Sequence, residues 1–122
     1  AKLGNLKAML ELGSMYDEVG DEMGVYKSIK KDPKLALKYY YQLVEKNCII
    51  GHFCFQSLLE NQIAAKINIK KNVLMLKKIN SKIKNYSKNP PKNDRLEELS
   101  LPRDKIIKLR EILNIMTTSK LI

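Results

Sequence analysis

Apolar side chains recur every three or four residues along most of the chain, and this spacing constrains the fold more than any other feature. The first such run is Leu6, Met9, Leu12, Gly13 and Tyr16. Steps of three and four residues place side chains on one face of an α-helix, whereas a β-strand alternates at every second residue. No segment sustains such alternation, and only 5 Gly and 4 Pro are present to make the many turns of an all-β sandwich. The 122 residues therefore predict one all-α domain.

Capping and turn residues divide the pattern into successive helices. Asp32 and Pro33 predict the start of a second helix, because Asp is a favoured N-cap and Pro fits the first helical position. Asn47 and Gly51 mark the end of this helix, and a third helix is expected from about Gly51. One face of the third helix is expected to carry Phe53, Cys54, Ser57, Leu58 and Ile63.

The second half of the chain predicts two more helices joined by a linker that contains Pro90 and Pro91, which cannot continue a helix. The fourth helix has lysines on one side and apolar residues on the other, and the apolar ones are Val73, Leu76, Ile79, Ile83 and Tyr86. A helical turn is expected at 94–99. Pro102 then opens a last helix, whose apolar stripe is Ile106, Leu109, Leu113 and Met116.

Two internal matches indicate a duplicated helix pair. Residues 4–12 match 51–59, with Gly at the start and Leu at the end of both segments. Residues 29–32 match 69–72, so that Asn72 stands as a capping residue where the first copy has Asp32. Such offsets are typical of helical-hairpin repeats, which form a short α-solenoid. We predict two helix-pair repeats in residues 1–88, the second degenerate, and a linker with a C-terminal capping helix in residues 89–122 of the same domain.

One set of small and aromatic residues resembles the Sel-one-like repeat, a relative of the tetratricopeptide repeat. The residues that match its pattern are Gly4, Ala8, Leu12, Gly13, Tyr16, Gly24, Val25, Lys31, Asp32, Ala36, Tyr40 and Gly51. The resemblance covers residues 2–52 well and 51–87 poorly. Small Ala8 and Gly13 would let two helices approach closely, Tyr16 and Tyr40 would fill the space between them, and Gly51 would supply a permissive conformation between hairpins. The tetratricopeptide repeat shares the Leu-Gly-x-x-Tyr core, but the longer period here makes it the second choice.

The resemblance implies a non-enzymatic adaptor that holds another protein or a peptide on a concave surface lined by the first helix of each pair. On that basis we predict partner-binding residues on one face of the first helix and at the corresponding position of the third. They are Lys7, Glu11, Ser14, Glu18 and Asn61. The alternative for this face is an ordinary solvated helix surface.

The positive charge is concentrated in one segment. The chain carries a formal net charge of +10, and no acidic residue occurs between Glu60 and Asp94, where nine lysines lie. Such a field attracts anionic partners, so the alternative function is nucleic-acid or other polyanion binding through the fourth helix. Its predicted residues are Lys70, Lys71, Lys77, Lys78, Lys82 and Lys84. A solvated lysine face is the competing interpretation, and membrane binding is disfavoured because the apolar side lacks Trp.

The chemically reactive residues are few. The spacing of Cys48, His52 and Cys54 matches no common structural zinc site, and residues two apart on a helix point in different directions. We therefore expect no metal, no cofactor and no enzymatic activity. A secreted subfamily of the resembled repeats pairs cysteines spaced C-x7-C, whereas the spacing here is C-x5-C. We expect a cytoplasmic location, or an exported one if Cys48 and Cys54 form a disulfide.

Overall fold

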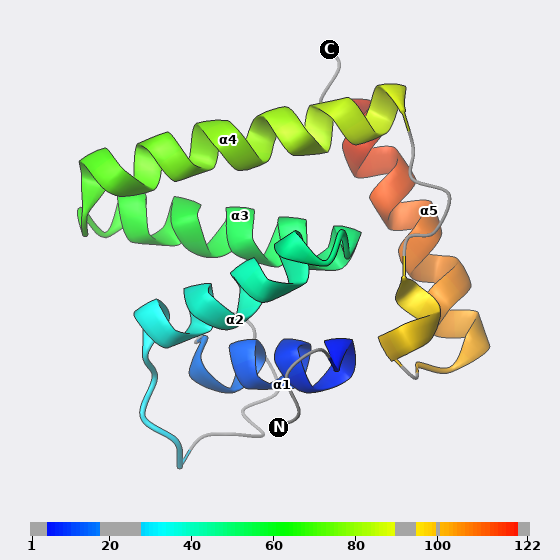
Figure 1. Cartoon of the computed structure of the whole chain (residues 1–122), viewed down its shortest axis with the longest axis horizontal. Coiled ribbons are helices and arrows are strands. Elements are labelled where there is room, and N and C mark those ends of the chain that lie inside the picture. Colours follow the sequence, from blue (N-terminus) through cyan, green and yellow to red (C-terminus); the bar gives the residue numbers. More distant parts are fainter. Residues whose placement is uncertain (1–4, 18–27, 90–94, 100, 120–122) are drawn as a thin grey trace.

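The structure, a computed structural model, describes residues 5–17, 28–89, 95–99 and 101–119. Within these residues it consists of helices and contains no strand, which confirms the predicted all-α class (Figure 1). The elements in chain order are α1 (Leu6–Tyr16), α2 (Pro33–Glu45), α3 (Ile49–Ala64), α4 (Ile69–Lys88), the short 3-10 helix η1 (Leu96–Leu99) and α5 (Arg103–Ser119). Each of the first four helices packs against the next one along the chain. Glu18, Gly4, Gly24, Val25, Pro90 and Pro91 lie outside the described residues.

Two polar side chains start the first helix pair. The Asn5 side chain accepts a hydrogen bond from the Ala8 amide at 3.1 Å, and Asp32 accepts one from the Leu35 amide at 3.2 Å. Each bond satisfies one of the amides that a helix N-terminus leaves without an intrahelical partner, a contribution of about 1 kcal/mol. Pro33 occupies the first position of α2. The predicted start of the second helix is thus confirmed at Asp32.

Gly51 was expected between two helix pairs, and the structure corrects this expectation. Asn47, with φ 59°, makes the left-handed turn after α2, and α3 begins at Ile49. Gly51 lies inside α3, where a Cβ atom would collide with Cβ of Leu43 and lie 3.2 Å from the Leu43 carbonyl carbon. The absence of a side chain therefore serves the close approach of α2 and α3 rather than a permissive turn.

Asn72 does not cap the fourth helix, which is a second correction. The N-cap of α4 is Asn68, whose backbone adopts a left-handed conformation with φ 45° and whose side chain makes no capping bond. Asn72 lies in the first turn of α4 and is buried, and its side-chain amide donates to the Ile67 carbonyl at 2.9 Å. The amide still satisfies a backbone group at this helix start, but from inside the helix.

Helix α3 is the centre of the core, because it packs against α2 on one side and α4 on the other. Its burial is therefore not confined to one face. Phe53 and Leu58 are buried as predicted, whereas Ser57 is exposed, contrary to prediction. Other α3 residues are also buried, namely Ile49, Gly51, His52, Phe55, Gln56 and Leu59. Across this interface the Gln56 side chain donates to Oδ1 of Asn80 at 2.7 Å.

In α4 and α5, residues predicted to lie on the apolar face are buried or partly buried where their side chains are described. Ile79 and Ile83 of α4 and Ile106 of α5 are buried, while Leu76 and Tyr86 are partly buried against the core. The side chains of Leu113 and Met116 lie outside the described ones. Sequence periodicity thus located the inner side of α4 because that helix, unlike α3, has a single buried face.

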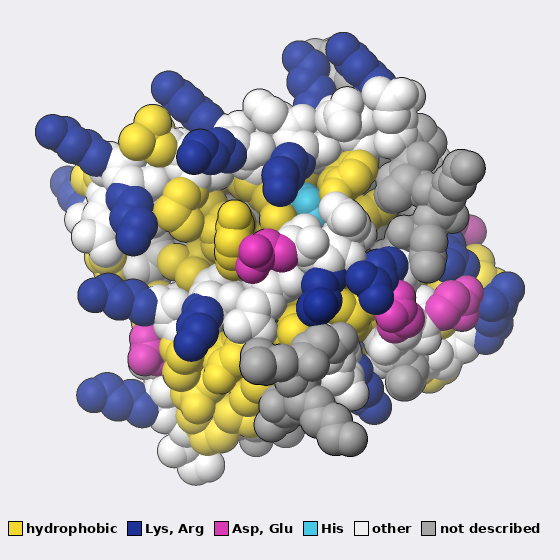
Figure 2. Space-filling view, viewed as in Figure 1, with side chains coloured by type: hydrophobic (Ala, Val, Ile, Leu, Met, Phe, Trp, Pro, Cys, Tyr) yellow, Lys and Arg dark blue, Asp and Glu magenta, His cyan; other side chains and the backbone are white. Residues whose placement is uncertain are grey.

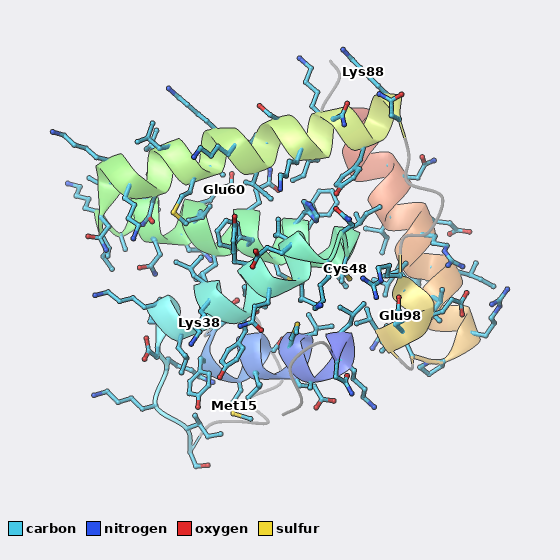
Figure 3. The ribbon with its side chains drawn as sticks, viewed as in Figure 1. Met15, Lys38, Cys48, Glu60, Lys88 and Glu98 are labelled. Carbon is cyan, nitrogen blue, oxygen red and sulfur yellow. The ribbon has the colours of Figure 1, made fainter. Side chains whose placement is uncertain are left out.

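The short helix η1 lies beside the first helix of the stack. Leu96 and Leu99 of η1 are buried, and η1 packs against α1. Arg95 donates to the Lys46 carbonyl at 2.8 Å and pairs with Glu98, so it ties this segment to the turn after α2. In Figures 1 and 3, η1 with Glu98 and α5 lie beside the stack, at the ends of the other helices. The capping role expected of residues 89–122 stays a prediction.

Candidate binding cleft

A cleft of about 800 Å³ opens between α2 and α4, above α3. Figure 2 shows it as apolar surface with lysine side chains on both sides and one acidic side chain next to it, in the region that Figure 1 assigns to α2 and α4. Binding sites for small ligands have volumes of roughly 300–1,000 Å³, so the cleft has the size of a recognition site. It joins residues from the two halves of the sequence, because α3 packs against both flanking helices.

The floor and walls of the cleft are mainly apolar. Phe55 of α3 lies at the floor, and its ring meets the ring of Tyr41 at a centroid distance of 5.5 Å and an angle of 51°. Phe55 is 2% exposed, whereas Tyr41 is 47% exposed, so the tyrosine offers the accessible ring. The remaining apolar lining residues are Leu37 and Val44 of α2 and Met75 and Ile79 of α4.

Five lysines surround this apolar floor. Two come from α2 and three from α4, and they are Lys34, Lys38, Lys71, Lys78 and Lys82. All five are exposed, and among the described residues none of them forms an ion pair. Figure 3 marks Lys38, which projects from α2. The cleft therefore presents cations whose charge is not neutralised by an ion pair within the described part of the chain.

Acidic side chains are nearly absent from the two helices that flank the cleft. Helix α4 has none, and α2 has only Glu45 at its last position. Glu45 is exposed and does not line the cleft. Two amides, Asn68 and Asn72, complete the polar part of the lining. No carboxylate, histidine or thiol lies among the lining residues, so the arrangement provides apolar contact and positive charge.

The structure divides the lysines of the predicted polyanion site into two groups. Lys71, Lys78 and Lys82 line the cleft. The row formed by Lys70, Lys77 and Lys84 is exposed but does not line it. At 100° per residue, the two groups lie about a third of a turn apart around α4. Only the first group faces an apolar surface.

The residues predicted to bind a partner from the first and third helices lie elsewhere. Lys7, Glu11 and Asn61 are exposed, and Ser14 is half-buried beside Tyr40. None of these residues lines the cleft. Their role in binding stays a prediction, as does that of Glu18, which lies outside the described residues.

Sequence reasoning missed the α2 half of the cleft. Lys34 and Lys38 are spaced by one helical turn, and so are Leu37 and Tyr41. This spacing was the only sequence pattern that we identify as pointing to a second lysine-lined wall. The signal was weak because the charge outside residues 60–94 is nearly balanced. Only the packing of α2 and α4 on opposite sides of α3 brings these residues opposite the lysines of α4.

The His52 ring is held by a backbone carbonyl and a tyrosine hydroxyl. His52 is fully buried, with Nδ1 2.9 Å from the Cys48 carbonyl oxygen and Nε2 3.0 Å from the Tyr86 hydroxyl. A carbonyl only accepts, so Nδ1 carries the ring proton and Nε2 accepts from Tyr86. Burial lowers the pKa of His52, and Lys82 lowers it further. Cys48 and Cys54 are thiols, not halves of a disulfide, and burial raises the pKa of Cys54 to about 12.

The described residues also bear on metal sites and membrane spans. Among those residues, no three His, Cys, Asp or Glu side chains come together where they could hold a metal ion. None of the helices described here combines the length and apolarity needed to cross a bilayer. Comparison with known proteins found no matching family model, no matching curated protein and no matching solved structure.

Proposed function

We propose that this chain is a non-enzymatic interaction module that holds a segment of another protein in the cleft between α2 and α4. The observation that carries the proposal is the combination of an apolar floor with five lysines that have no ion-pair partner among the described residues. Binding sites commonly pair an apolar lining with a few placed polar groups that orient the partner. Here the lysines are placed along both edges of the apolar strip.

The proposal includes the expected repeat architecture. We assign α1 with α2 and α3 with α4 to two helix pairs of a short α-solenoid of the Sel-one-like type, with residues 89–122 as its cap. The sequence resemblance and the packing of each helix against the next support this assignment. The cleft lies between the second helices of the two pairs, not between the first helices that the resemblance implies.

A photo-crosslinking amino acid tests the proposal. It is placed at Tyr41, whose ring is accessible in the cleft, and the full chain is irradiated in a lysate treated with nuclease. The matched control places the same group at Leu74, which is 61% exposed on α4 and does not line the cleft. Proteins crosslinked at Tyr41 and not at Leu74 are expected, in near-stoichiometric yield. Equal yields at the two positions would contradict a cleft-specific interaction.

Polyanion binding is the second candidate function. The observation in its favour is the exposed position of Lys70 and Lys77, which lie on α4 away from the cleft. Phosphate contacts alone give a binding that weakens steeply with salt. If capture is abolished by nuclease, or falls steeply at moderate salt, the lysine row becomes the favoured site.

A further inference from the structure

The charges around the cleft are distributed along its length. On α4, Lys71 and Lys82 are eleven positions apart with Lys78 between them, which corresponds to roughly 16 Å at 1.5 Å per residue. On α2, Lys34 and Lys38 lie one turn apart on the opposite wall. A ligand with one anionic group would reach only one part of this array. An elongated partner with several negative charges would use all of it.

The apolar contacts follow the same axis. On α2, Leu37, Tyr41 and Val44 are spaced by four and three residues, and on α4 Met75 and Ile79 are spaced by four. Each set therefore lies along one face of its helix. Tyr41, Leu37 and Met75 offer accessible apolar surface. Val44 and Ile79 are buried beneath them. An amphipathic helix laid along this apolar strip would place its apolar side chains on the accessible residues.

Aromatic stacking is limited in the cleft. Of its two aromatic residues, Phe55 is 2% exposed and only Tyr41 offers an accessible ring. Single-stranded nucleic acids are held by successive bases stacked on several aromatic rings. One accessible ring beside an aliphatic strip suits leucine-like side chains better than a row of bases.

We infer that the occupant of the cleft is an acidic amphipathic segment of a partner protein, about three helical turns long, with apolar side chains on one face and carboxylates on both flanks. This inference rests on the proposed function and names its partner class. The argument is charge complementarity, because the lysines of both walls lie where the flanking carboxylates of such a segment would lie.

Synthetic peptides test the inference by their binding to the full chain. Three peptides share one amphipathic apolar pattern and carry Glu, Gln or Lys at the flanking positions, and a fourth is a scrambled form of the Glu peptide. Fluorescence anisotropy measures their affinities, with oligothymidine and with vesicles of phosphatidylcholine and phosphatidylserine as competitors. We expect the Glu peptide to bind at least tenfold more tightly than each of the other three. We also expect both competitors to displace it poorly.

Matched variants distinguish the cleft from the general charge of the protein. Lys78→Glu with Lys82→Glu changes two cleft lysines, and Lys70→Glu with Lys77→Glu makes the same charge change on α4 outside the cleft. The first pair of substitutions is expected to weaken binding of the Glu peptide at least tenfold, and the second pair less than threefold. Circular dichroism checks that both variants keep the helical fold, which is expected because all four lysines are exposed.

Four results would overturn the inference. Equal effects of the two lysine pairs would show that the lysines attract anions without any preference for the cleft. Stronger binding of oligothymidine or vesicles than of the Glu peptide would lead to the same conclusion. Equal affinity for the Glu and Gln peptides would show that charge complementarity does not contribute to binding. No peptide binding, together with a protein crosslinked specifically from Tyr41, would reject the acidic partner class and leave the proposed function standing. Failure of the crosslink would reject that function itself.

Discussion

The ring of Tyr40 lies directly against the backbone of Gly13, so that a Cβ atom at Gly13 would come within 2.6 Å of Cδ1 of Tyr40. This contact joins α1 to α2 at a point where Tyr40 is 1% exposed. It confirms the expectation that Gly13 allows a close helix approach and that Tyr40 fills the adjoining space. Beside it, the Tyr16 ring stacks on Tyr39 at a centroid distance of 6.3 Å.

The first prediction concerns Gly13→Ala. In an open helix the change would stabilise the chain by about 1 kcal/mol, because Ala has the higher helix propensity. Here the added methyl group forces the buried ring of Tyr40 to move, and such overpacking costs roughly 1–3 kcal/mol. We expect a net loss of stability in urea unfolding. The control is Ser57→Ala at an exposed position of α3, which should leave stability unchanged or raised. A stabilised Gly13→Ala variant would contradict the packing.

The second prediction concerns the buried hydrogen bond between Tyr40 and Asp17. The Tyr40 hydroxyl donates to Oδ2 of Asp17 at 2.9 Å, and burial together with the Asp17 charge raises the pKa of Tyr40. Tyr40→Phe removes this donor, and Asp17 stays buried at 6% exposure. Because a buried acceptor then loses a hydrogen bond, the free energy of unfolding should fall by about 1–3 kcal/mol. Tyr39→Phe, the same change at a half-buried neighbour, serves as the control.

A double-mutant cycle with Asp17→Asn isolates the pair. We expect the loss in the double variant to be smaller than the sum of the two single losses, because each single change already breaks the same bond. Strict additivity of the unfolding free energies would show that the hydroxyl and the carboxylate contribute independently.

The third prediction is a loss of stability at mildly acidic pH. Burial lowers the pKa of His52 below its ordinary value of about 6.5. Well above pH 6.5 the ring is neutral in both states and contributes no pH dependence. As the pH falls below 6.5, the unfolded chain binds a proton that the folded chain does not, so the free energy of unfolding decreases, by at most about 1.4 kcal/mol per pH unit. The decrease ends below the folded-state pKa.

Urea unfolding between pH 7.5 and pH 5 measures this slope. The His52→Gln variant lacks the titrating ring, and its unfolding free energy should vary less over the same range. Its absolute stability is expected to be lower, because the buried ring and its contact with Tyr86 are lost, but the comparison uses slopes alone. Identical slopes in the two proteins would assign the acid sensitivity to other groups.

The fourth prediction concerns thiol reactivity. Burial raises the pKa of Cys54 to about 12, and the thiolate is the reactive form. At pH 8 we expect iodoacetamide to modify Cys54 in the folded chain at least about a hundredfold more slowly than in the urea-unfolded chain, as followed by peptide mass mapping. The rate in urea is the internal control, and equal rates in the two states would mean that the thiol is accessible and readily ionised.

Helix positions were predictable because their signals are local. Asp32 with Pro33 fixed the start of α2, and the spacing of Ile79 and Ile83 fixed the inner face of α4. Two errors have different causes, one in long-range packing and one in a local hydrogen bond. Ser57 was assigned to a buried face because periodicity assumes one such face, whereas α3 is covered by two helices. Asn72 matched Asp32 in the internal repeat and was therefore expected to cap a helix. Its side chain instead bonds a backbone carbonyl from inside the helix, and residue type alone does not distinguish the two positions.

The sequence by itself determined the all-α class, the order of the helices and the lysine-rich character of α4, since each depends on neighbours within a few residues. Only the tertiary structure decided that Lys34 and Lys38 share a cleft with Lys71, Lys78 and Lys82. That arrangement depends on α2 and α4 both packing on α3, with Phe55 between them at the floor. Helices α2 and α4 face each other across the cleft because α3 is buried on both sides. The spacing of residues within a single helix does not encode this arrangement.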